Sequence, residues 1–461
     1  MAEFTTTNPT TGRTDKEFST LGSTEMERVL AQSHAEFARW RATAAQERAS
    51  ILGRVADAYE NRSRELAELI AVEMGKPLAQ ALGEVKLAGS IYRWYATHGP
   101  ELLQPEQLDP QGAQESLVQT EPIGPLVGVM PWNFPYYQVA RFVAPNLMAG
   151  NTIILKHAEI CAGSSEAMAE ILHEAGVPQD AYANVFATHD QIADMVADPR
   201  VRGVSLTGSE SAGAAVAENA GKHLKKSVLE LGGSDPLIML DGADLEQVAR
   251  TVATARLSNA GQACNSPKRI FVPAAKLEAF VATVVAAFEA ATLGDPLDES
   301  VDVGPLSSVG ARDTVVEQVA TAVRQGATLH TGGQPLDRDG AFMQPAVLTG
   351  VTPEMDAYTE EIFGPVAVIY GVDSEEEAVE LANDVPFGLS GSVWGTDLEH
   401  AQGVADRLDV GMAYVNEHGT TLPGLPFGGV NSSGYGRYHG IWGFREFSNA
   451  RSVYIVDHVP S

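Results

Sequence analysis

The sequence contains few cysteines and no long apolar segment. Its 461 residues include only Cys161 and Cys264, too few for a disulfide framework in a chain of this length. The longest apolar stretch, residues 280–293, is interrupted by Glu289 and is shorter than the roughly 20 residues that span a bilayer. The first residues, Met-Ala-Glu-Phe-Thr-Thr-Thr, lack the basic and apolar segments of a secretory signal. We therefore expect a cytoplasmic protein.

Basic residues are also scarce. The chain has 31 lysines and arginines against 60 aspartates and glutamates, which gives a formal net charge of −29. Such a surface repels nucleic-acid phosphates and anionic lipids, and the densest basic cluster, residues 222–226, is too short to offset it. We expect neither a nucleic-acid partner nor a membrane partner. The histidines show no metal-ligand spacing and there is no Gly-Lys-Ser/Thr phosphate loop, so no metal site is predicted.

The remaining pattern predicts an α/β protein of two or three domains, at roughly 150 residues per domain. Apolar residues at helical spacing predict helices throughout the first hundred residues, one of them ending at Gly75. Short apolar runs such as 125–130 and 152–155 then alternate with helical segments, and the alternation restarts near residue 231. This alternation is typical of parallel sheets covered on both faces, with a nucleotide at the carboxyl ends of the strands.

The segment 452–456, Ser-Val-Tyr-Ile-Val, predicts a lone, exposed strand after a Gly-rich stretch. An apolar strand of this kind requires a partner edge. Because oligomers are most often built from copies of one chain, we expect a homodimer or a homotetramer.

Cys264 lies in a loop of small residues between a predicted helix and a predicted strand, where a substrate can approach its sulfur. Lys268 and Arg269 follow closely and favour a thiolate. From its position alone, the cysteine is either a nucleophile or a loop residue without a task. Cys161, at a strand-to-helix connection, is interpreted as a small buried residue.

Two further polar residues follow predicted buried strands. Glu230 stands between apolar neighbours and a Gly pair, where a buried carboxylate suits a general base; the alternative is a strand-end charge that points to solvent. Asn133 lies in the turn 131–135, where a rigidly placed amide suits an oxyanion; the alternative is a turn former. The residues alone leave both questions open.

Two strand-to-helix junctions are candidates for binding a nucleotide. Residues 206–213 bring helix-terminal amides towards any anion at that point, although the Gly-x-Gly-x-x-Gly spacing is missing. Residues 156–159 follow the neighbouring predicted strand, from which Lys156 can reach a ribose. Each junction is alternatively a plain connecting loop.

Seven short motifs occur in one order over nearly the whole chain, and together they resemble those of the aldehyde dehydrogenase superfamily. Each motif is weak alone, but all seven in the family's order are specific. The motifs are Met74-Gly-Lys-Pro77, Pro131-Trp-Asn-Phe-Pro135, Leu206-Thr-Gly-Ser209, Leu229-Glu-Leu-Gly-Gly233, Gly261-Gln-Ala-Cys264, Glu361-Ile-Phe-Gly-Pro365 and Leu425-Pro-Phe-Gly-Gly429.

The resemblance implies an α/β, aldehyde dehydrogenase-like fold with a Rossmann-type cofactor domain, an α/β catalytic domain and a small β oligomerisation element. The expected NAD-binding domain comprises residues 1–103 and 122–231, and the expected catalytic domain comprises residues 232–432. Residues 104–121 and 433–461 are expected to form the oligomerisation strands.

The resemblance also implies the oxidation of an aldehyde to a carboxylic acid with NAD(P)+ and water. Cys264 is then the nucleophile that forms a thioester, and the Asn133 amide and the Cys264 backbone N–H hold the developing oxyanion. Glu230 activates the water that releases the acid. Without this carboxylate the thioester would await another acceptor, such as coenzyme A, so its presence favours hydrolysis.

The family resemblance further implies the cofactor contacts. Ser209 is expected at the pyrophosphate, Lys156 at the adenosine ribose and Glu361 at the nicotinamide ribose. The Glu159 carboxylate accepts hydrogen bonds from a ribose diol and repels a 2′-phosphate, so NAD is expected in preference to NADP, although Lys156 leaves NADP possible. The other expected cofactor contacts are Trp132, Gly208, Leu231 and Phe363.

For the substrate, residues 232–236 and the Lys156-His157 pair resemble bacterial NAD(P)-dependent succinate-semialdehyde dehydrogenases. In that substrate class Arg141 would bind the distal carboxylate, because an anion approaching a −29 protein needs a local positive charge. Tyr137 and Thr421 are the other expected substrate contacts. Alternatively, Arg141 forms a salt bridge on a helix surface.

Three other functions stay open. Tyr136, Tyr137 and Trp442 suit an apolar or aromatic aldehyde, so the alternative substrate range is that of a broad-specificity aliphatic or aromatic aldehyde dehydrogenase. An alternative of another class is a catalytically silent NAD-binding or structural protein on the same fold. A cofactor-independent thiol hydrolase that uses Cys264 is a third.

Overall fold

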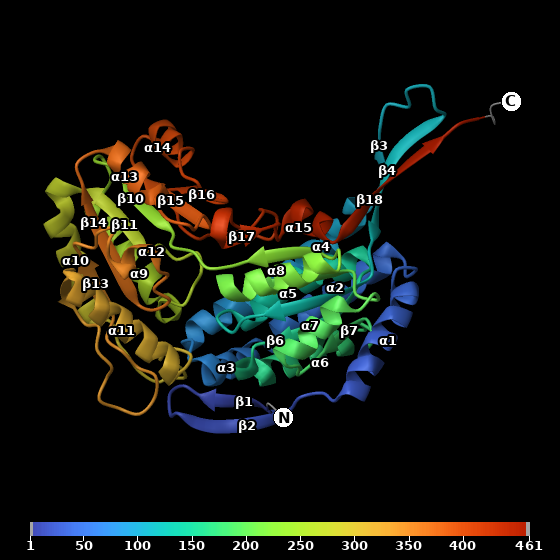
Figure 1. The fold of residues 1–461 in the computed structure, drawn as a ribbon, viewed down its shortest axis with the longest axis horizontal. Helices are drawn as coiled ribbons and strands as arrows, with labels where there is room; N and C mark the ends of the chain where they lie inside the picture. Colours follow the sequence, from blue (N-terminus) through green and yellow to red (C-terminus); the bar gives the residue numbers. More distant parts are fainter. Residues whose placement is uncertain (1–2, 458–461) are drawn as a thin grey trace.

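The structure, a computed structural model, describes residues 3–457 and contains four β-sheets of two, three, six and seven strands. Figure 1 shows the seven-stranded sheet at one end of the molecule and the six-stranded sheet beside it, with helices packed around both. The three-stranded sheet projects from the body, and the two-stranded sheet lies along the opposite side. Within residues 3–457, no helix has the length and apolarity needed to cross a bilayer.

The first residues differ from the helical prediction. They form an antiparallel hairpin, β1 (Glu3–Asn8) and β2 (Arg13–Ser19). Phe4 and Phe18 pack against the ring of Phe186, with ring centroids 5.2 and 4.9 Å away. The prediction of helices is therefore wrong for residues 3–19, because the hairpin depends on contact with Phe186, far along the chain.

Four helices follow as predicted: α1 (Ser23–Trp40), α2 (Ala45–Asn61), α3 (Ser63–Met74) and α4 (Leu78–Leu102). Gly75 ends α3 with a left-handed φ of +84°, as expected of a helix C-terminus. A side chain there would also collide with Pro305, so the glycine lets the Met74–Pro77 segment pass close to the second half of the chain.

The six-stranded sheet has the order β17-β9-β8-β5-β6-β7, and all its neighbours are parallel except β17 and β9. Each strand is connected to the next by a helix, and the carboxyl ends of the parallel strands meet at one edge. The strands are β5 (Pro125–Met130), β6 (Thr152–His157), β7 (Tyr182–Asn184), β8 (Gly203–Thr207), β9 (Lys226–Glu230) and β17 (Gly434–Tyr435); the helices are α5 (Pro135–Ala149), η1 (Glu159–Cys161) with α6 (Ala162–Glu174), α7 (His189–Ala197) and α8 (Glu210–Lys222).

The seven-stranded sheet has the order β12-β13-β14-β11-β10-β15-β16 and is parallel except at β12. Its strands are β10 (Pro236–Met239), β11 (Arg269–Pro273), β12 (Thr328–Thr331), β13 (Ala346–Thr349), β14 (Val366–Val372), β15 (Ser390–Trp394) and β16 (Met412–Val415). Its helices are α9 (Leu245–Leu257), η3 (Ala274–Lys276) with α10 (Leu277–Ala290), α11 (Val309–Gln325), α12 (Asp356–Thr359), α13 (Glu375–Asn383) and α14 (Leu398–Ala405).

The sheet order brings three of the sequence motifs together. Residues 232–235 precede β10, the loop of Cys264 precedes β11, and residues 361–365 precede β14. Because β10, β11 and β14 are neighbours, these segments lie side by side at the amino edge of the seven-stranded sheet.

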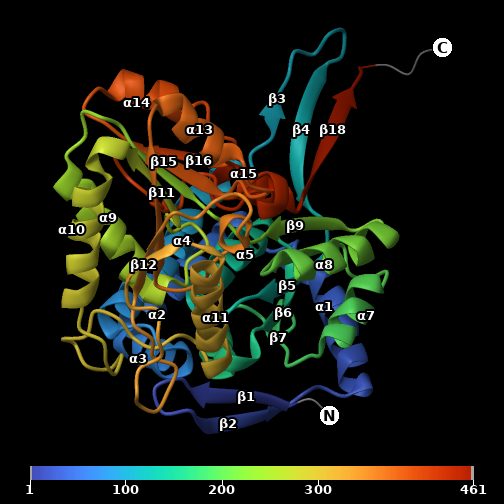
Figure 2. The same cartoon turned by 60° about the vertical axis from the view of Figure 1, so that its left-hand side comes forward.

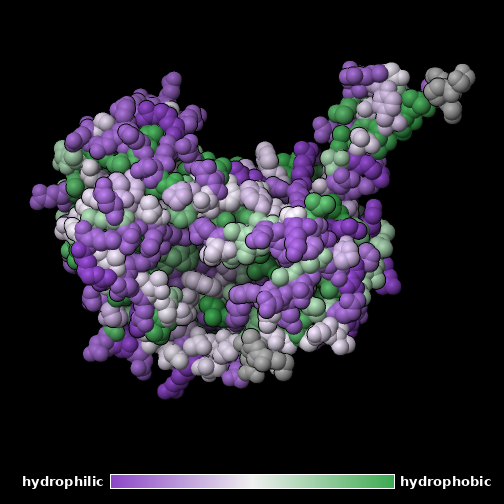
Figure 3. Space-filling view, in the orientation of Figure 1, coloured by the Kyte–Doolittle hydropathy of each residue, from purple (hydrophilic) through white to green (hydrophobic). Residues whose placement is uncertain are grey.

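The projecting sheet consists of β3 (Glu106–Gln107), β4 (Glu115–Pro122) and β18 (Ser448–Ile455). The C-terminal strand is therefore not lone: β18 pairs with β4 along its whole length, from Ser448↔Pro122 to Ile455↔Glu115. The sheet stands clear of the body in two views, and apolar side chains reach its surface (Figures 2 and 3). Of residues 433–457, β17 pairs with β9 in the body, and β18 alone belongs to the projecting sheet.

Candidate active site

A cavity of about 280 Å³ lies where the carboxyl edge of the six-stranded sheet meets the amino edge of the seven-stranded sheet. Its wall combines residues that are far apart in the sequence. Among the residues expected to be catalytic or to bind the cofactor, those on the wall are Trp132, Asn133, Gly208, Ser209, Glu230, Leu231, Cys264, Glu361 and Phe363.

The loop of Cys264 begins with an unusual backbone turn. Asn259 and Ala260 both have φ of +51° and Gly261 has φ of +72°, three successive left-handed residues in η2 (Ser258–Gly261). A Cβ at Gly261 would overlap with the carbonyl of Gly364, so only glycine fits there. The Asn259 amide compensates for the strain by donating to the Asn133 and Gln262 carbonyls, at 2.9 and 3.0 Å.

The thiol of Cys264 is half-buried at the cavity. Burial raises its pKa well above the usual range, and the Glu230 carboxylate raises it further, while Arg141 and Lys268 act in the opposite direction. Lys268 therefore acts in the direction expected from the sequence, but burial and Glu230 outweigh it. Arg269 takes no part, because its guanidinium donates to the carbonyls of Leu381 and Ala382.

Glu230, at the end of β9, is fully buried, so the alternative of a strand-end charge in solvent is wrong. Its Oε2 accepts a hydrogen bond from Arg141 Nη2 at 2.6 Å. Within the described residues its Oε1 has no hydrogen-bond partner. A carboxylate with one free oxygen, next to a protonated thiol, is placed to accept a proton.

Arg141 is also fully buried, so a salt bridge on a helix surface is excluded. The reason is that every residue of α5 is buried. Besides Glu230, Nη2 reaches Thr207 Oγ1 at 2.8 Å, and the guanidinium lies 4.2 Å from the Tyr438 ring centroid. Its Nε and Nη1 have no hydrogen-bond partner within residues 3–457, but they are buried, and Arg141 is not among the residues that line the cavity.

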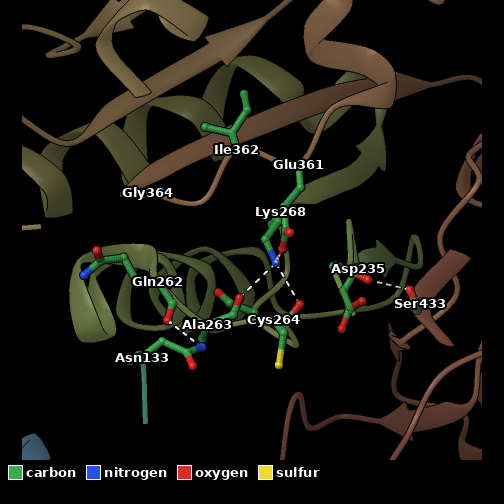
Figure 4. Close-up of polar contacts among 12 residues, drawn as sticks. Asn133, Asp235, Gln262, Ala263, Cys264, Lys268, Glu361, Ile362, Gly364 and Ser433 are labelled. Atoms are coloured by element: carbon green, nitrogen blue, oxygen red, sulfur yellow. Dashed lines mark hydrogen bonds and ion pairs between the residues drawn. The ribbon is translucent and has the colours of Figure 1, made fainter. Parts of the chain in front are cut away.

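Asn133 turns its side chain towards the loop of Cys264. Its Nδ2 donates to the Gln262 carbonyl at 3.3 Å, as Figure 4 shows. Its own backbone carbonyl accepts from Lys76 Nζ at 2.9 Å. Asn133 is thus fixed by hydrogen bonds at both its side-chain amide and its backbone carbonyl.

Sequence reasoning missed the support beneath Asn133. Lys76 and Glu84 form a buried ion pair, and Glu84 Oε1 accepts from the backbone N–H groups of Tyr136 and Tyr137 at 2.9 and 3.3 Å. These are first-turn donors of α5, so the pair fixes the start of this helix next to Asn133. The sequence pointed to Lys76 only through the family motif Met74-Gly-Lys-Pro77, which assigned no role to this lysine.

The cofactor side of the cavity fits a dinucleotide. Ser209 is the N-cap of α8, where first-turn N–H groups suit a pyrophosphate. A Cβ on Gly232 would overlap with Glu210 Oε1 and lie 2.7 Å from Glu361 Oε2, so the glycine lets these two carboxylates approach the backbone of this wall. The Trp132 and Phe363 rings meet edge to face at 5.8 Å.

Lys156 and Glu159 lie outside this cavity, at the end of β6. Lys156 Nζ donates to Glu159 Oε1 at 2.6 Å, and the lysine side chain is only 4% exposed whereas that of Glu159 is 47% exposed. The carboxylate therefore covers the ammonium on the side from which a ligand would approach.

The expected substrate residues are only partly brought together. Tyr137 contacts Arg141, its ring centroid 5.2 Å from the guanidinium, and its hydroxyl pairs with His439 Nε2 at 3.1 Å. Thr421 lies in a segment whose Gly419 carbonyl accepts from Asn265 Nδ2 at 3.0 Å, next to Cys264. Tyr136 is fully buried against Tyr59 and is not a pocket residue; Trp442 is 55% exposed.

The two sheets with their shared cavity define an oxidoreductase that acts on aldehydes with a nicotinamide cofactor. The chain belongs to the aldehyde dehydrogenase family, whose model matches residues 2–453. The predicted fold class is thereby confirmed. Within residues 3–457 there is no group of side chains that could hold a metal ion.

Among curated proteins, the chain is 49% identical to succinate-semialdehyde dehydrogenase [NADP(+)] of Deinococcus radiodurans, over 98% of this chain and 94% of that protein. It is 40% identical to succinate semialdehyde dehydrogenase [NAD(P)+] Sad of Escherichia coli, over 97% and 96%. Among solved structures, succinic semialdehyde dehydrogenase of Streptococcus pyogenes in complex with NADP+ has a TM-score of 0.97 at 40% identity, covering 98% of this chain and all of that chain.

Proposed function

We propose that the protein oxidises succinate semialdehyde to succinate with NAD(P)+ and water. The observation that carries this proposal is Arg141, a buried guanidinium beside the base whose Nε and Nη1 have no partner within the described residues, so a substrate carboxylate that reached them would complete their hydrogen bonds. A substrate that bears an aldehyde and a distal carboxylate suits this pairing. The similarity to succinate-semialdehyde dehydrogenases over nearly the whole chain supports the same substrate.

In the proposed first step the Cys264 thiol gives its proton to Glu230 as Sγ adds to the aldehyde carbon. The carbonyl π electrons move onto oxygen, where Asn133 Nδ2 and the Cys264 N–H donate hydrogen bonds. The bound dinucleotide supplies the acceptor for the hydride that leaves this carbon. Glu230 next passes the proton of the thiol to solvent. The carboxylate then takes a proton from a water whose oxygen attacks the thioester carbon; the C–S bond breaks, the acid leaves, and the Cys264 thiolate takes the proton back from Glu230.

Residues on both sides of the cavity are proposed to hold the cofactor. Gly208 and Ser209 at the start of α8 bind the pyrophosphate, Lys156 and Glu159 bind the adenosine ribose, and Glu361 binds the nicotinamide ribose. Trp132, Leu231 and Phe363 complete the walls around the rings. Apart from Lys156 and Glu159, which lie at the end of β6, all of these residues line the cavity.

We expect the wild-type enzyme to prefer succinate semialdehyde over pentanal, a neutral aldehyde of similar length, and over benzaldehyde. The kcat/KM advantage over pentanal should be about 10- to 100-fold, the worth of one hydrogen-bonded ion pair. Arg141→Ala should remove this advantage. It should also slow pentanal oxidation, because Arg141 contacts Glu230 as well.

The measurement is therefore the ratio of kcat/KM for succinate semialdehyde to kcat/KM for pentanal, and not the loss of activity with one substrate. Each rate is followed by the absorbance of the reduced nicotinamide. Equal kcat/KM values for succinate semialdehyde and pentanal in the wild type would favour the broad-specificity alternative. An unchanged ratio in Arg141→Ala would show that another residue binds the carboxylate of succinate semialdehyde.

NAD+ is expected to be preferred over NADP+, because the exposed Glu159 carboxylate repels a 2′-phosphate and occupies Lys156. Glu159→Ser should free the ammonium and raise kcat/KM for NADP+ by about 10-fold or more. Glu101→Ser, a change of an exposed glutamate on α4, is the matched control. A wild-type kcat/KM that favours NADP+ would contradict this expectation.

We also propose the division into parts expected from the sequence: residues 1–103 and 122–231 bind the dinucleotide, residues 232–432 carry the nucleophile, and residues 104–121 act with β18 in oligomerisation. The projecting sheet supports a homodimer or a homotetramer, since Tyr454 is 61% exposed on it and Ile455 is 40% exposed. A cytoplasmic location is proposed with it, in keeping with two unpaired cysteines.

A further inference from the structure

Lys268 lies between the loop of Cys264 and the cofactor side of the cavity, although its side chain is only 4% exposed. Its Nζ donates to the carbonyls of Ala263 and Cys264 at 2.9 and 2.7 Å. Glu361 Oε1 lies 3.0 Å from Nζ as an ion pair, without a hydrogen bond, since this oxygen has no hydrogen-bond partner within the described residues. Two of the three N–H donors of the ammonium are thus engaged by carbonyls of the Cys264 loop.

Figure 4 shows the ammonium on one side of this loop and the Cys264 sulfur pointing to the other. The bond between Ala263 and Cys264 is a planar peptide unit, in which the carbonyl and the N–H point in opposite directions. Lys268 therefore acts on the oxygen of the same peptide whose N–H, on the far side, is the proposed donor to the substrate oxygen.

A charged donor on the carbonyl oxygen withdraws electrons from the peptide and makes its N–H a stronger donor. The same contact stops the peptide from rotating. Substrate oxygen gains negative charge as sulfur adds, so this donor matters more in the transition state than in the bound aldehyde. A change at Lys268 should thus appear in kcat and leave KM for the aldehyde nearly unchanged.

From these contacts we infer that Lys268 is a positioning residue of the oxyanion site, which holds the Ala263–Cys264 peptide and strengthens the Cys264 N–H as a donor. The inference rests on the proposed role of Cys264 as the nucleophile. It is independent of which aldehyde is oxidised, because Lys268 contacts the loop and not the region of Arg141. The Glu361 carboxylate holds the ammonium in place from the cofactor side.

The positive charge has a second, separately measurable effect. It opposes burial and Glu230 in setting the pKa of the Cys264 thiol. Removal of the charge should raise that pKa, and the pH at which iodoacetamide alkylation of the cofactor-free protein reaches half its maximal rate should rise with it. A residue that only packs the loop would not move this profile.

The test compares Lys268→Met, Lys268→Gln and Lys268→Arg, with Lys222→Met, a change of an exposed lysine at the end of α8, as the control. In Lys268→Met, kcat should fall about 10-fold or more for every aldehyde oxidised, less than the roughly 10²- to 10³-fold loss when a direct oxyanion donor is removed. The alkylation profile should move to higher pH. Lys268→Arg should keep the wild-type profile, and Lys222→Met should keep both kcat and the profile.

An unchanged kcat and an unchanged alkylation profile in Lys268→Met would overturn the inference. So would a fall in kcat without any movement of the profile, since the role would then be structural. If Lys268→Met does not fold, Lys268→Gln takes its place; failure of both to fold, while Lys268→Arg folds, would also assign a structural role. Alkylation needs no aldehyde, so a wrong substrate assignment would leave this readout intact.

Discussion

Replacement of Cys264 by serine is expected to lower kcat/KM for succinate semialdehyde by at least about 10⁴-fold. A serine hydroxyl is a poor nucleophile without a base that fully deprotonates it, and an oxygen ester is less reactive towards water than a thioester. The measurement is initial-rate production of reduced nicotinamide, with the fold checked by thermal unfolding.

Cys161→Ala is the matched control, because it removes the second thiol of the chain. Cys161 is fully buried at the start of α6 and has no contact with the cavity wall beyond a weak 3.8 Å bond to the Trp132 carbonyl. This variant should retain activity. Full turnover by Cys264→Ser would remove the basis of the proposed mechanism.

Glu230→Gln is expected to lower steady-state kcat by about 10²- to 10⁴-fold while a first turnover remains detectable. Hydrolysis of the thioester needs Glu230 as the base for water, whereas in the first step the Cys264 thiol of this variant can lose its proton to solvent, because its pKa is lower without the Glu230 charge. Rapid mixing should therefore show a burst of about one reduced nicotinamide per active site, and intact-protein mass spectrometry should show the acylated enzyme. A slow linear progress curve without a burst would show that acylation limits turnover in this variant and would contradict a main role of Glu230 in hydrolysis.

Glu230→Gln should also shift the pH dependence of Cys264 alkylation, and the sign of this shift follows from the loss of a negative charge. The Glu230 carboxylate raises the pKa of Cys264 because it disfavours a neighbouring thiolate. Its neutral replacement should lower that pKa, so alkylation of Cys264 should begin at lower pH. Glu230→Gln leaves the buried Arg141 without its counter-charge, which destabilises the fold. The double variant Glu230→Gln/Arg141→Met removes both charges, so comparison of the two variants separates loss of stability from loss of chemistry.

Local features of the fold were predictable from the sequence. Gly75 ends α3 because its backbone adopts a left-handed conformation that glycine favours, and the apolar strands β5 and β6 alternate with helices as their composition predicts. The β1–β2 hairpin was not predictable, because it is stabilised through Phe186. The partner of the C-terminal strand was equally hidden, since β4 lies more than 300 positions away in the sequence.

At the site, motif order gave the identities of Cys264, Glu230 and Asn133, and the structure places all three on one cavity wall. Their catalytic roles remain predictions. What the sequence did not contain was the pairing of Arg141 with Glu230, because helical spacing does not reveal that α5 is buried on every side. Similarly, Lys76 and Lys268 act on backbone carbonyls, which have no signature in the side-chain pattern.

The loop of Cys264 lies at the amino edge of the seven-stranded sheet. The carboxyl edge of this sheet lies at the other end of its strands. The connections there, such as residues 373–374 between β14 and α13, lie across the length of the strands from the sulfur. Ordinarily the carboxyl edge of a parallel sheet hosts the ligand, and its loops tolerate little change. In this molecule those connections, Asp373 and Ser374 among them, line a separate cavity of about 570 Å³, across the sheet from the sulfur.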